Sequence, residues 1–482
     1  MRNLGKKIAQ GALVLSSFYL LVACGVANKP LDVKNTLPAS YGVAQADTAN
    51  VATQPWHLFY ADTCLTSLIR EGLAHNPDVQ IALDNVRVAR ASYVVERAAL
   101  LPGVNAAIRT TVDRYGEYTM NGIGNDDTNR SETLPSDKKL PDPYPELFAG
   151  LTFNWEANLW GKLSNRRKAA QARLLASEEV RHGVASQLIS TIAENYYALV
   201  GLDQERTVLL ENLRLQEIGF DLVKVQKAGG RVNQLAVDQF EAQLLNTRSR
   251  LVQVNQEILA AEAGLNRLIG RYTHALNRSS IAAYDSVSAV AVGTTEQLLR
   301  HRPDIRQAEL NVRAAHADVG AARAAFYPGL SLSAAAGFSA FEVSKWFMSP
   351  GSAAYSLGAG LTAPIFQRGR IKAIYAAASA SQHIALMQYQ QSLLTAYYEV
   401  YVVLNNLSNL QQQIALKDEE ATVQRRAFDN SNDLFSVGYA SYLEVITAQR
   451  RLLDVELELA HLKKELLQNH AVLYRALGGG WR

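Results

Sequence analysis

The sequence predicts a mainly helical, internally duplicated protein in which each chain contributes four strands to a membrane β-barrel. Three observations point to this class. Motifs recur at constant spacing, four segments alternate apolar and polar residues, and two long stretches lack proline. None of the 13 prolines falls between Pro145 and Pro303 or after Pro364. Because proline ends helices, its absence permits very long ones.

The duplication is visible as pairs of short motifs. Two pairs are offset by 226 residues, namely "NPDV" at 76–79 with "RPDI" at 302–305, and "LPGV" at 101–104 with "YPGL" at 327–330. Three later pairs are offset by 208 residues, namely Gly161 with Gly369, Gly230 with Gly438, and "LNRLIG" at 265–270 with "LYRALG" at 473–478. The first copy therefore carries about 18 extra residues. The polar run at 121–146 accounts for them and predicts a solvent-exposed loop.

The first 23 residues are typical of a lipoprotein signal peptide. A positively charged start precedes a mostly apolar run at 8–21, which is too short to span a bilayer. Small residues before Cys24 resemble the lipobox of bacterial lipoproteins, so we expect cleavage there and lipid on the Cys24 sulfur. Gly25 stands where aspartate often marks inner-membrane retention, which favours the outer membrane. The alternative is an ordinary signal peptide with an incidental cysteine.

Charge and cysteine content exclude some classes of partner. Removing residues 1–23 takes away three positive charges, so the formal net charge of +3 becomes 0. We therefore expect no nucleic-acid partner. Once Cys24 carries lipid, Cys64 has no partner within the chain, and we expect a buried thiol rather than a reactive one.

After the signal peptide, an extended segment at 24–64 leads into the first repeat at 65–270. A connector at 271–294, irregular and rich in small residues, precedes the second repeat at 295–482. Each repeat is predicted to hold a helix, two strands, a long helix, a glycine turn and a return helix. The expected first helices are 65–100 and 295–326. The long helices are 161–228 and 370–437, and the return helices are 231–269 and 440–477.

The strands are expected at about 103–118, 147–160, 329–341 and 354–367. Their period of two gives one apolar and one polar face, as in Val104, Ile108 and Val112 against Asn105 and Arg109. A soluble sandwich is the alternative, but the segments are long enough to cross a membrane when tilted. Four strands cannot close a barrel, and an open edge in lipid leaves backbone groups unpaired. Three copies would supply twelve strands around a polar-lined pore.

The long helices need partners as well. A helix of about 67 residues is roughly 100 Å long at its standard rise. Near-heptad apolar spacing, for example Leu452, Val455, Leu459 and Leu462, indicates coiled-coil seams. Gly230 and Gly438 then mark the tips of two helical hairpins, because glycine tolerates the left-handed backbone of a tight reversal.

In this order and repeated twice, the motifs resemble the TolC-like outer-membrane efflux proteins, specifically the lipid-anchored members that serve resistance-nodulation-division pumps. The resemblance is carried by "WHLFYADTCLTSLIREGLAHNPDV", "RPDI", "FYPGLSL", "LTAPIFQRGR" and "VGYASYLEVITAQRRLL". It implies a homotrimer with a twelve-stranded barrel, a periplasmic tunnel of twelve helices and a small mixed equatorial domain around 271–294. The implied partners are a periplasmic adaptor (membrane fusion protein), the inner-membrane pump and outer-membrane lipid.

The resemblance also implies where the periplasmic entrance lies. An apolar ring falls on Leu443, and the carboxylate common four residues later falls on Thr447, so this sequence departs from the family pattern. Glu444 is the nearest acid that could substitute, and Phe435 is a further gate candidate. The adaptor-contact candidates are Gly229, Gly230, Arg231, Val437 and Gly438. Inter-helix hydrogen bonds in the closed state are expected from Arg231, Gln234, Asp433 and Tyr442, with solvated turn residues as the alternative.

Enzyme chemistry is not expected. The nine histidines show no metal-ligand spacing, and His470, between Leu466 and Leu473, is better explained as a packed core residue. No catalytic or phosphate-binding motif is present, and no cofactor is expected besides the lipid on Cys24. The predicted function is a passive export duct for drugs or other small toxic compounds. Type I protein secretion, metal-ion efflux and a poreless structural coiled coil are the alternatives.

Overall fold

The computed structural model describes residues 38, 40–41, 50–284 and 292–481. The expected signal peptide and Cys24 lie outside the described residues. The chain divides into two compact units. Within the described residues, unit 1 holds 89–174 and 311–385, and unit 2 holds 38, 40–41, 50–88, 175–284, 292–310 and 386–481.

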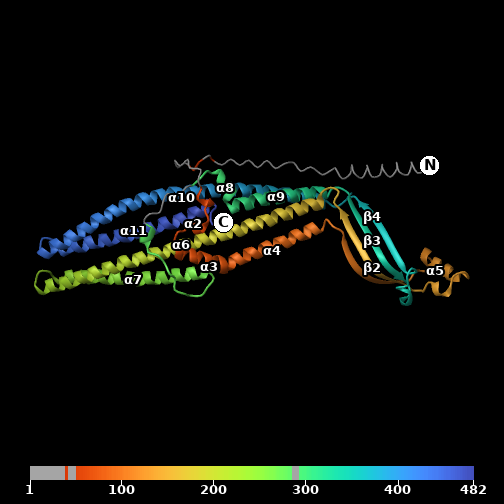
Figure 1. The fold of residues 1–482 in the computed structure, drawn as a ribbon, viewed down its shortest axis with the longest axis horizontal. Coiled ribbons are helices and arrows are strands. Elements are labelled where there is room, and N and C mark those ends of the chain that lie inside the picture. The colour runs from red at the N-terminus through yellow and green to blue at the C-terminus, as the bar shows by residue number, and fades with distance from the viewer. Residues whose placement is uncertain (1–37, 39, 42–49, 285–291, 482) are drawn as a thin grey trace. The chain divides into compact units, whose positions relative to one another are not determined.

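Unit 1 contains a single antiparallel sheet in the order β1-β2-β3-β4. Figure 1 labels three of its strands, β2, β3 and β4. Its strands are β1 Gly103–Asp113, β2 Tyr144–Ala157, β3 Gly329–Ala340 and β4 Ala353–Thr362. In the register, Leu151 lies opposite Ala106 on one side and Ala336 on the other. The sheet therefore joins the strand pairs of both repeats, with β1 and β4 as its edges.

The boundaries of this sheet differ from expectation. The first strand ends at Asp113 instead of 118, and the polar run expected as a loop contains a helix, α5 Met120–Arg130, and the turn η2 Ser136–Lys138. α5 begins where the Thr119 side chain accepts a hydrogen bond from the Gly122 amide. Lys345, in η4 Val343–Lys345, lies 3.6 Å from the Asp137 carboxylate, so the two hairpin loops are bonded to each other.

The first helix of each repeat is broken, which corrects the prediction of continuous helices at 65–100 and 295–326. Repeat 1 has α3 Thr63–His75 and α4 Pro77–Ala98, and repeat 2 has α8 Glu296–His301 and α9 Pro303–Ala324. The breaks fall at Asn76 and Arg302, both in extended conformation. A residue before proline is disfavoured in helical conformation, whereas proline suits the first helical position.

Two helical hairpins dominate unit 2 (Figure 1). The first pairs α6 Lys162–Ala228 with α7 Gln234–Leu268, and the second pairs α10 Arg370–Val437 with α11 Tyr442–Ala476. A large core lies between α3, α6, α7 and α11, and it includes Leu65, Ile192, Tyr196, Leu265 and Leu467. The short elements η1 Val51–Thr53 and α2 Trp56–Phe59 also contribute side chains to this core.

The connector between the repeats is fastened to this core by polar contacts. Arg278 forms ion pairs with Asp203 on α6 and Glu262 on α7. Tyr284, in η3 Ile281–Tyr284, donates a hydrogen bond to Asp62 at the start of α3. Among the residues that the structure describes, no helix carries an apolar stretch long enough to cross a bilayer.

Candidate functional site

The two hairpin tips turn in the same way. In the first, the Arg231 amide donates to the Gln226 carbonyl at 2.9 Å and the Gly230 amide donates to Lys227 at 2.9 Å. In the second, Tyr439 donates to Leu434 at 2.8 Å and Gly438 donates to Phe435 at 3.2 Å. This is the Schellman pattern, which requires a left-handed residue. Gly230 has φ 72° and Gly438 has φ 90°.

A second apolar core lies next to the tips and joins the two hairpins of one chain. Its buried members from hairpin 1 are Val223, Ala236, Val237 and Phe240, and those from hairpin 2 are Phe428, Phe435, Val445 and Leu452. Phe435 is only 6% exposed. The structure thus places this gate candidate inside the packing of its own chain, whereas a constriction of a pore needs an exposed side chain.

Leu443 and Thr447 lie on an exposed face at the start of α11. Leu443 is 56% exposed, and Thr447, one helical turn later, is exposed too. We call two residues counterparts when they are 208 positions apart in the two repeats. The counterpart of Leu443 is Leu235 at the start of α7, which is 54% exposed. Each tip therefore presents one leucine at the equivalent place.

Glu444 has a local structural role. Its carboxylate accepts a hydrogen bond from the Ser441 amide at 2.6 Å, and the Ser441 side chain accepts one from the Glu444 amide, forming a capping box. These bonds from Ser441 lower the pKa of Glu444. The acid that was expected to replace the missing family carboxylate is thus engaged as the cap of its own helix.

Two of the polar residues expected at the tips have different surroundings, since Gln234 is hydrogen-bonded to charged side chains and Tyr442 packs in the tip core. Gln234 accepts a hydrogen bond from Lys227 and donates one to Asp238 at 2.6 Å. Their counterparts are Phe435, Tyr442 and Ile446, which all belong to the apolar tip core. One tip therefore carries a polar ladder where the other carries packed side chains. All five adaptor-contact candidates are exposed, namely Gly229, Gly230, Arg231, Val437 and Gly438.

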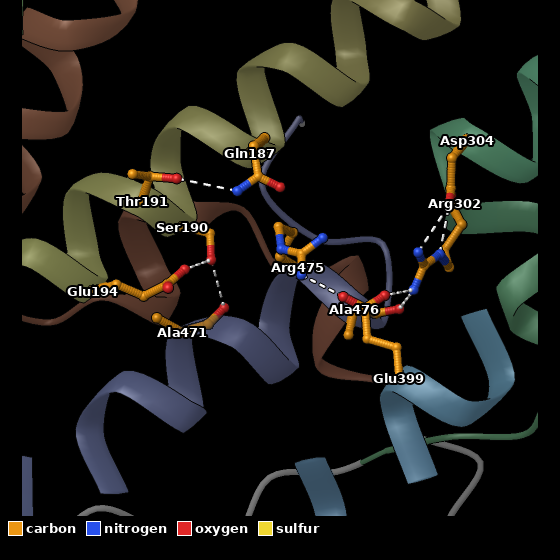
Figure 2. Close-up of polar contacts among 10 residues, drawn as sticks. All are labelled: Gln187, Ser190, Thr191, Glu194, Arg302, Asp304, Glu399, Ala471, Arg475 and Ala476. Atoms are coloured by element: carbon orange, nitrogen blue, oxygen red, sulfur yellow. Dashed lines mark hydrogen bonds and ion pairs between the residues drawn. The ribbon is translucent and has the colours of Figure 1, made fainter. Parts of the chain in front are cut away.

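A charged cluster around the buried Arg302 lies at the opposite end of α11 (Figure 2). Arg302, 5% exposed, donates to Glu399 at 2.6 Å, to the Ala476 carbonyl at 2.8 Å and to both oxygens of Asp304. Glu399 also pairs with Arg475. Burial acts to lower the pKa of Arg302, but the hydrogen bonds and charges of its acidic partners outweigh burial and raise it. We call Arg302, Asp304, Glu399 and Arg475 the arginine clamp.

The motif "RPDI" was interpreted as a repeat motif and as part of the family resemblance, and the clamp was missed. A basic residue directly before a helix-starting proline was the available signal. Its acidic partner Glu399 lies 97 residues away, and no local pattern connects the two.

Two other expectations concern single residues. His470 is 7% exposed, and burial lowers its pKa to about 4. Cys64 is half-buried rather than buried, and within the part of the chain that the structure describes it forms no disulfide. The described residues contain no group of three or more metal-ligating side chains that could hold a metal ion.

Comparison with known proteins gives consistent matches along the chain. A family model described as outer membrane efflux protein matches residues 68–271 and 294–479. The pyoverdine export outer membrane protein OpmQ of Pseudomonas aeruginosa is 32% identical over 476 residues, covering 97% of this chain and 96% of OpmQ. The probable outer membrane lipoprotein SilC of Salmonella typhimurium is 29% identical over 427 residues, 88% of each chain.

CusC, a cation efflux system protein of Escherichia coli, is 28% identical over 466 residues, covering 95% of this chain and 97% of CusC. A solved structure of CusC is similar to this fold with a TM-score of 0.82 and 26% identity. That match covers 95% of this chain and 100% of the CusC chain.

Proposed function

This chain belongs to the outer membrane efflux protein family, and from this premise we propose that three copies form a duct that exports drugs or other small toxic compounds. It is an outer-membrane protein. The duct leads from periplasm to exterior and is passive. A resistance-nodulation-division pump of the inner membrane supplies the energy and reaches the duct through a periplasmic adaptor.

The main support for this proposal is that a single chain leaves the edges of its sheet unpaired and the apolar faces of its helices exposed. β1 and β4 are edge strands of an open four-stranded sheet. Large apolar side chains on these edge strands are exposed, with Ile108 and Leu357 each at 81%. In lipid an open edge leaves backbone groups without partners, so the edges of neighbouring copies must pair. Three copies give twelve strands.

The helices of unit 2 are incomplete in the same sense. Leu245, Val252 and Leu259 on α7 repeat every seven residues and are 56–70% exposed. On α10, Leu416 and Val423 have the same spacing and are 67% and 50% exposed. Heptad seams of this kind are buried in coiled coils. Further copies of the chain would cover both and would close the helices into a tunnel.

The periplasmic gate is assigned to Leu443 and its neighbour Thr447. They form the exposed face at the tip, where three copies around one axis would present three leucines. Phe435 supports this face from within the tip core, and Glu444 caps the helix that carries it. Opening then requires the tips to separate. The exposed turn from Gly229 to Arg231, together with Val437 and Gly438, is the proposed contact for the adaptor.

Cys24 is the proposed lipid anchor. The apolar run before it and the small residues beside it support acylation after cleavage. The similarity to SilC, a probable outer membrane lipoprotein, supports the same assignment. No other cofactor belongs to the proposal.

The proposed cargo is a small solute rather than a protein. OpmQ is named for pyoverdine export and CusC for cation efflux. Both kinds of cargo are small compared with a polypeptide, and they differ from each other, which supports a duct whose selectivity resides in its pump.

Reconstitution into planar bilayers tests the channel. We expect trimers with stable single-channel conductance, and deletion of the gene should sensitise cells to several unrelated toxic compounds. A stable monomer without conductance would overturn the proposal. Leu443→Ala should raise conductance if this residue forms the constriction, and unaltered conductance removes it as the gate. Leu235→Ala is the matched variant on the other hairpin and shows which of the two leucines narrows the pore.

A further inference from the structure

Helices α6 and α11 form an interface between the two hairpins within one chain. The Gln468 side chain donates to the Glu194 carbonyl at 3.0 Å, and Ser190 donates to the Ala471 carbonyl at 3.4 Å. Part of this interface is visible in Figure 2. Further toward the tips, Asn212 donates to the Glu456 carboxylate at 3.3 Å. The interface therefore has a defined register along both helices.

The counterparts of these contact residues lie exposed. On α11, Leu453 and Leu467 are 1% and 4% exposed. Their α7 counterparts Leu245 and Leu259 are 56% and 58% exposed. On α6, Ser190 is 1% exposed, and its α10 counterpart Tyr398 is 59% exposed. The equivalent helix faces are thus buried on α6 and α11 but exposed on α10 and α7.

We propose that α10 of one copy packs against α7 of the next copy in the register of the α6–α11 interface. The inference rests on the proposed trimer and adds the register of the helices and the side-chain contacts between neighbouring copies. A ring of alternating hairpins places each hairpin between two others. Within one chain α6 packs against α11. Because α10 is the counterpart of α6 and α7 is the counterpart of α11, the equivalent contact between copies is α10 against α7.

The register makes a specific charge prediction. The counterpart of Asn212 is Glu420, and the counterpart of Glu456 is Arg248. The hydrogen bond within the chain therefore becomes an ion pair between copies, from Glu420 to Arg248. The approach of Lys464 to Gly201 likewise becomes an amide contact between Gln256 and Asn409. The 208-residue offset alone selects Glu420 and Arg248, and the two side chains carry opposite charges.

The ion pair would join two bridges that already exist in each chain. Glu420 lies 2.9 Å from Lys417 on α10, and Arg248 lies 2.9 Å from Glu217 on α6. Across the interface the four side chains alternate in sign. All four are partly exposed in the single chain, so each remains available to a neighbour.

The same residues disfavour a shifted register. A slip by one heptad would place Glu420 opposite Glu241, a like charge, or opposite Asn255, which is neutral. Like charges across an interface reduce the affinity for the wrong arrangement, and this is how coiled coils select a register. The proposed register is the one among these three that pairs opposite charges.

Cross-linking tests the contact directly. In the full-length protein with Cys64→Ala, the double variant Glu420→Cys with Arg248→Cys should give dimers and trimers after treatment with a short bis-maleimide. A short linker is preferred because a disulfide requires Cα atoms within about 7 Å. Glu420→Cys with Asn255→Cys is the shifted control and should cross-link several-fold less. Asn212→Cys with Glu456→Cys should cross-link within one chain only.

Charge reversal gives an independent readout. Arg248→Glu and Glu420→Arg should each weaken the trimer in salt-dependent fashion, with about tenfold lower association per interface. The double reversal should restore it. Arg214→Glu, another exposed reversal on a helix of the same hairpin, should leave assembly unchanged.

The outcomes separate the two proposals. A conducting trimer that fails to cross-link at 248 and 420, or that shows no rescue by the double reversal, overturns the register while the export duct stands. A monomeric parent protein without conductance overturns both. Selective cross-linking together with rescue supports the register.

Discussion

Asn76 and Arg302 take the same place in the two repeats and solve the same problem with different chemistry. Asn76 donates to the Leu268 carbonyl at 2.8 Å, and Arg302 donates to the Ala476 carbonyl at 2.8 Å. Leu268 and Ala476 are themselves counterparts. Each side chain thus ties the break before a proline helix to the end of a return helix.

The junctions at Asn76 and at Arg302 differ at two positions together, the break residue and its partner on the long helix. The Arg302 partner Glu399 has Thr191 as its counterpart, so repeat 1 lacks both the buried cation and its acid. We expect Arg302→Asn alone to destabilise the protein by about 1–2 kcal/mol, because the partly buried Glu399 carboxylate loses one of its two arginine partners. Arg302→Asn with Glu399→Thr, which copies repeat 1, should recover much of that loss. Denaturant unfolding of the solubilised protein measures both, and a double variant as unstable as the single one would contradict this account.

His470 should make the protein sensitive to acid. Its Nε2 atom has no hydrogen-bond partner among the described residues, and burial lowers its pKa from 6.5 to about 4. Between these values the unfolded chain binds more protons, so stability falls as pH decreases from 6.5 to about 4, by up to about 3 kcal/mol.

His470→Leu should remove this component while changing stability at pH 7 by less than about 1.5 kcal/mol. Unfolding curves at several pH values between 4 and 7 measure the effect. His461→Leu, at an exposed position of α11, is the control and should keep the acid sensitivity of the parent. Equal pH dependence in the parent and His470→Leu would exclude this histidine as the source.

Gly438 should not tolerate a side chain. Its φ of 90° is left-handed, which costs an ordinary residue about 1–2 kcal/mol. Gly438→Ala should therefore lower the free energy of unfolding by that amount although nothing lies near the added methyl group. Gly264→Ala is a matched control inside α7 that has equally open space. It should be neutral or stabilising by up to about 1 kcal/mol, since alanine favours helices.

Tyr196 and Tyr284 both donate hydrogen bonds to Asp62, but they should differ in their cost. The Tyr196 hydroxyl also accepts a hydrogen bond from the Ser279 amide at 2.9 Å. Tyr284→Phe should cost about 1 kcal/mol, whereas Tyr196→Phe should cost about 1 kcal/mol more because the Ser279 amide loses an acceptor. Thermal unfolding ranks the two, and a larger loss for Tyr284→Phe would show that the assignment is wrong.

Local periodicity is the reason that much of the fold could be predicted. Period-two alternation placed the four strands, proline-free stretches placed the long helices, and the repeat offsets identified Gly230 and Gly438 as equivalent turns. The family resemblance then indicated an outer-membrane efflux channel, which the comparisons confirm. Each of these signals is carried by neighbouring residues or by motif order, so no knowledge of packing was needed.

The sequence by itself thus determined the duplication, the element types and the family. Only the tertiary structure decided what individual polar residues do. It enclosed Phe435 in the tip core, engaged Glu444 in a capping box and brought Arg302 to Glu399, 97 residues away. Such roles depend on which helix faces meet and how far water is excluded, and these follow from the packing of distant segments. The sequence alone does not distinguish a charged residue that is exposed to solvent from one that is buried in an ion pair.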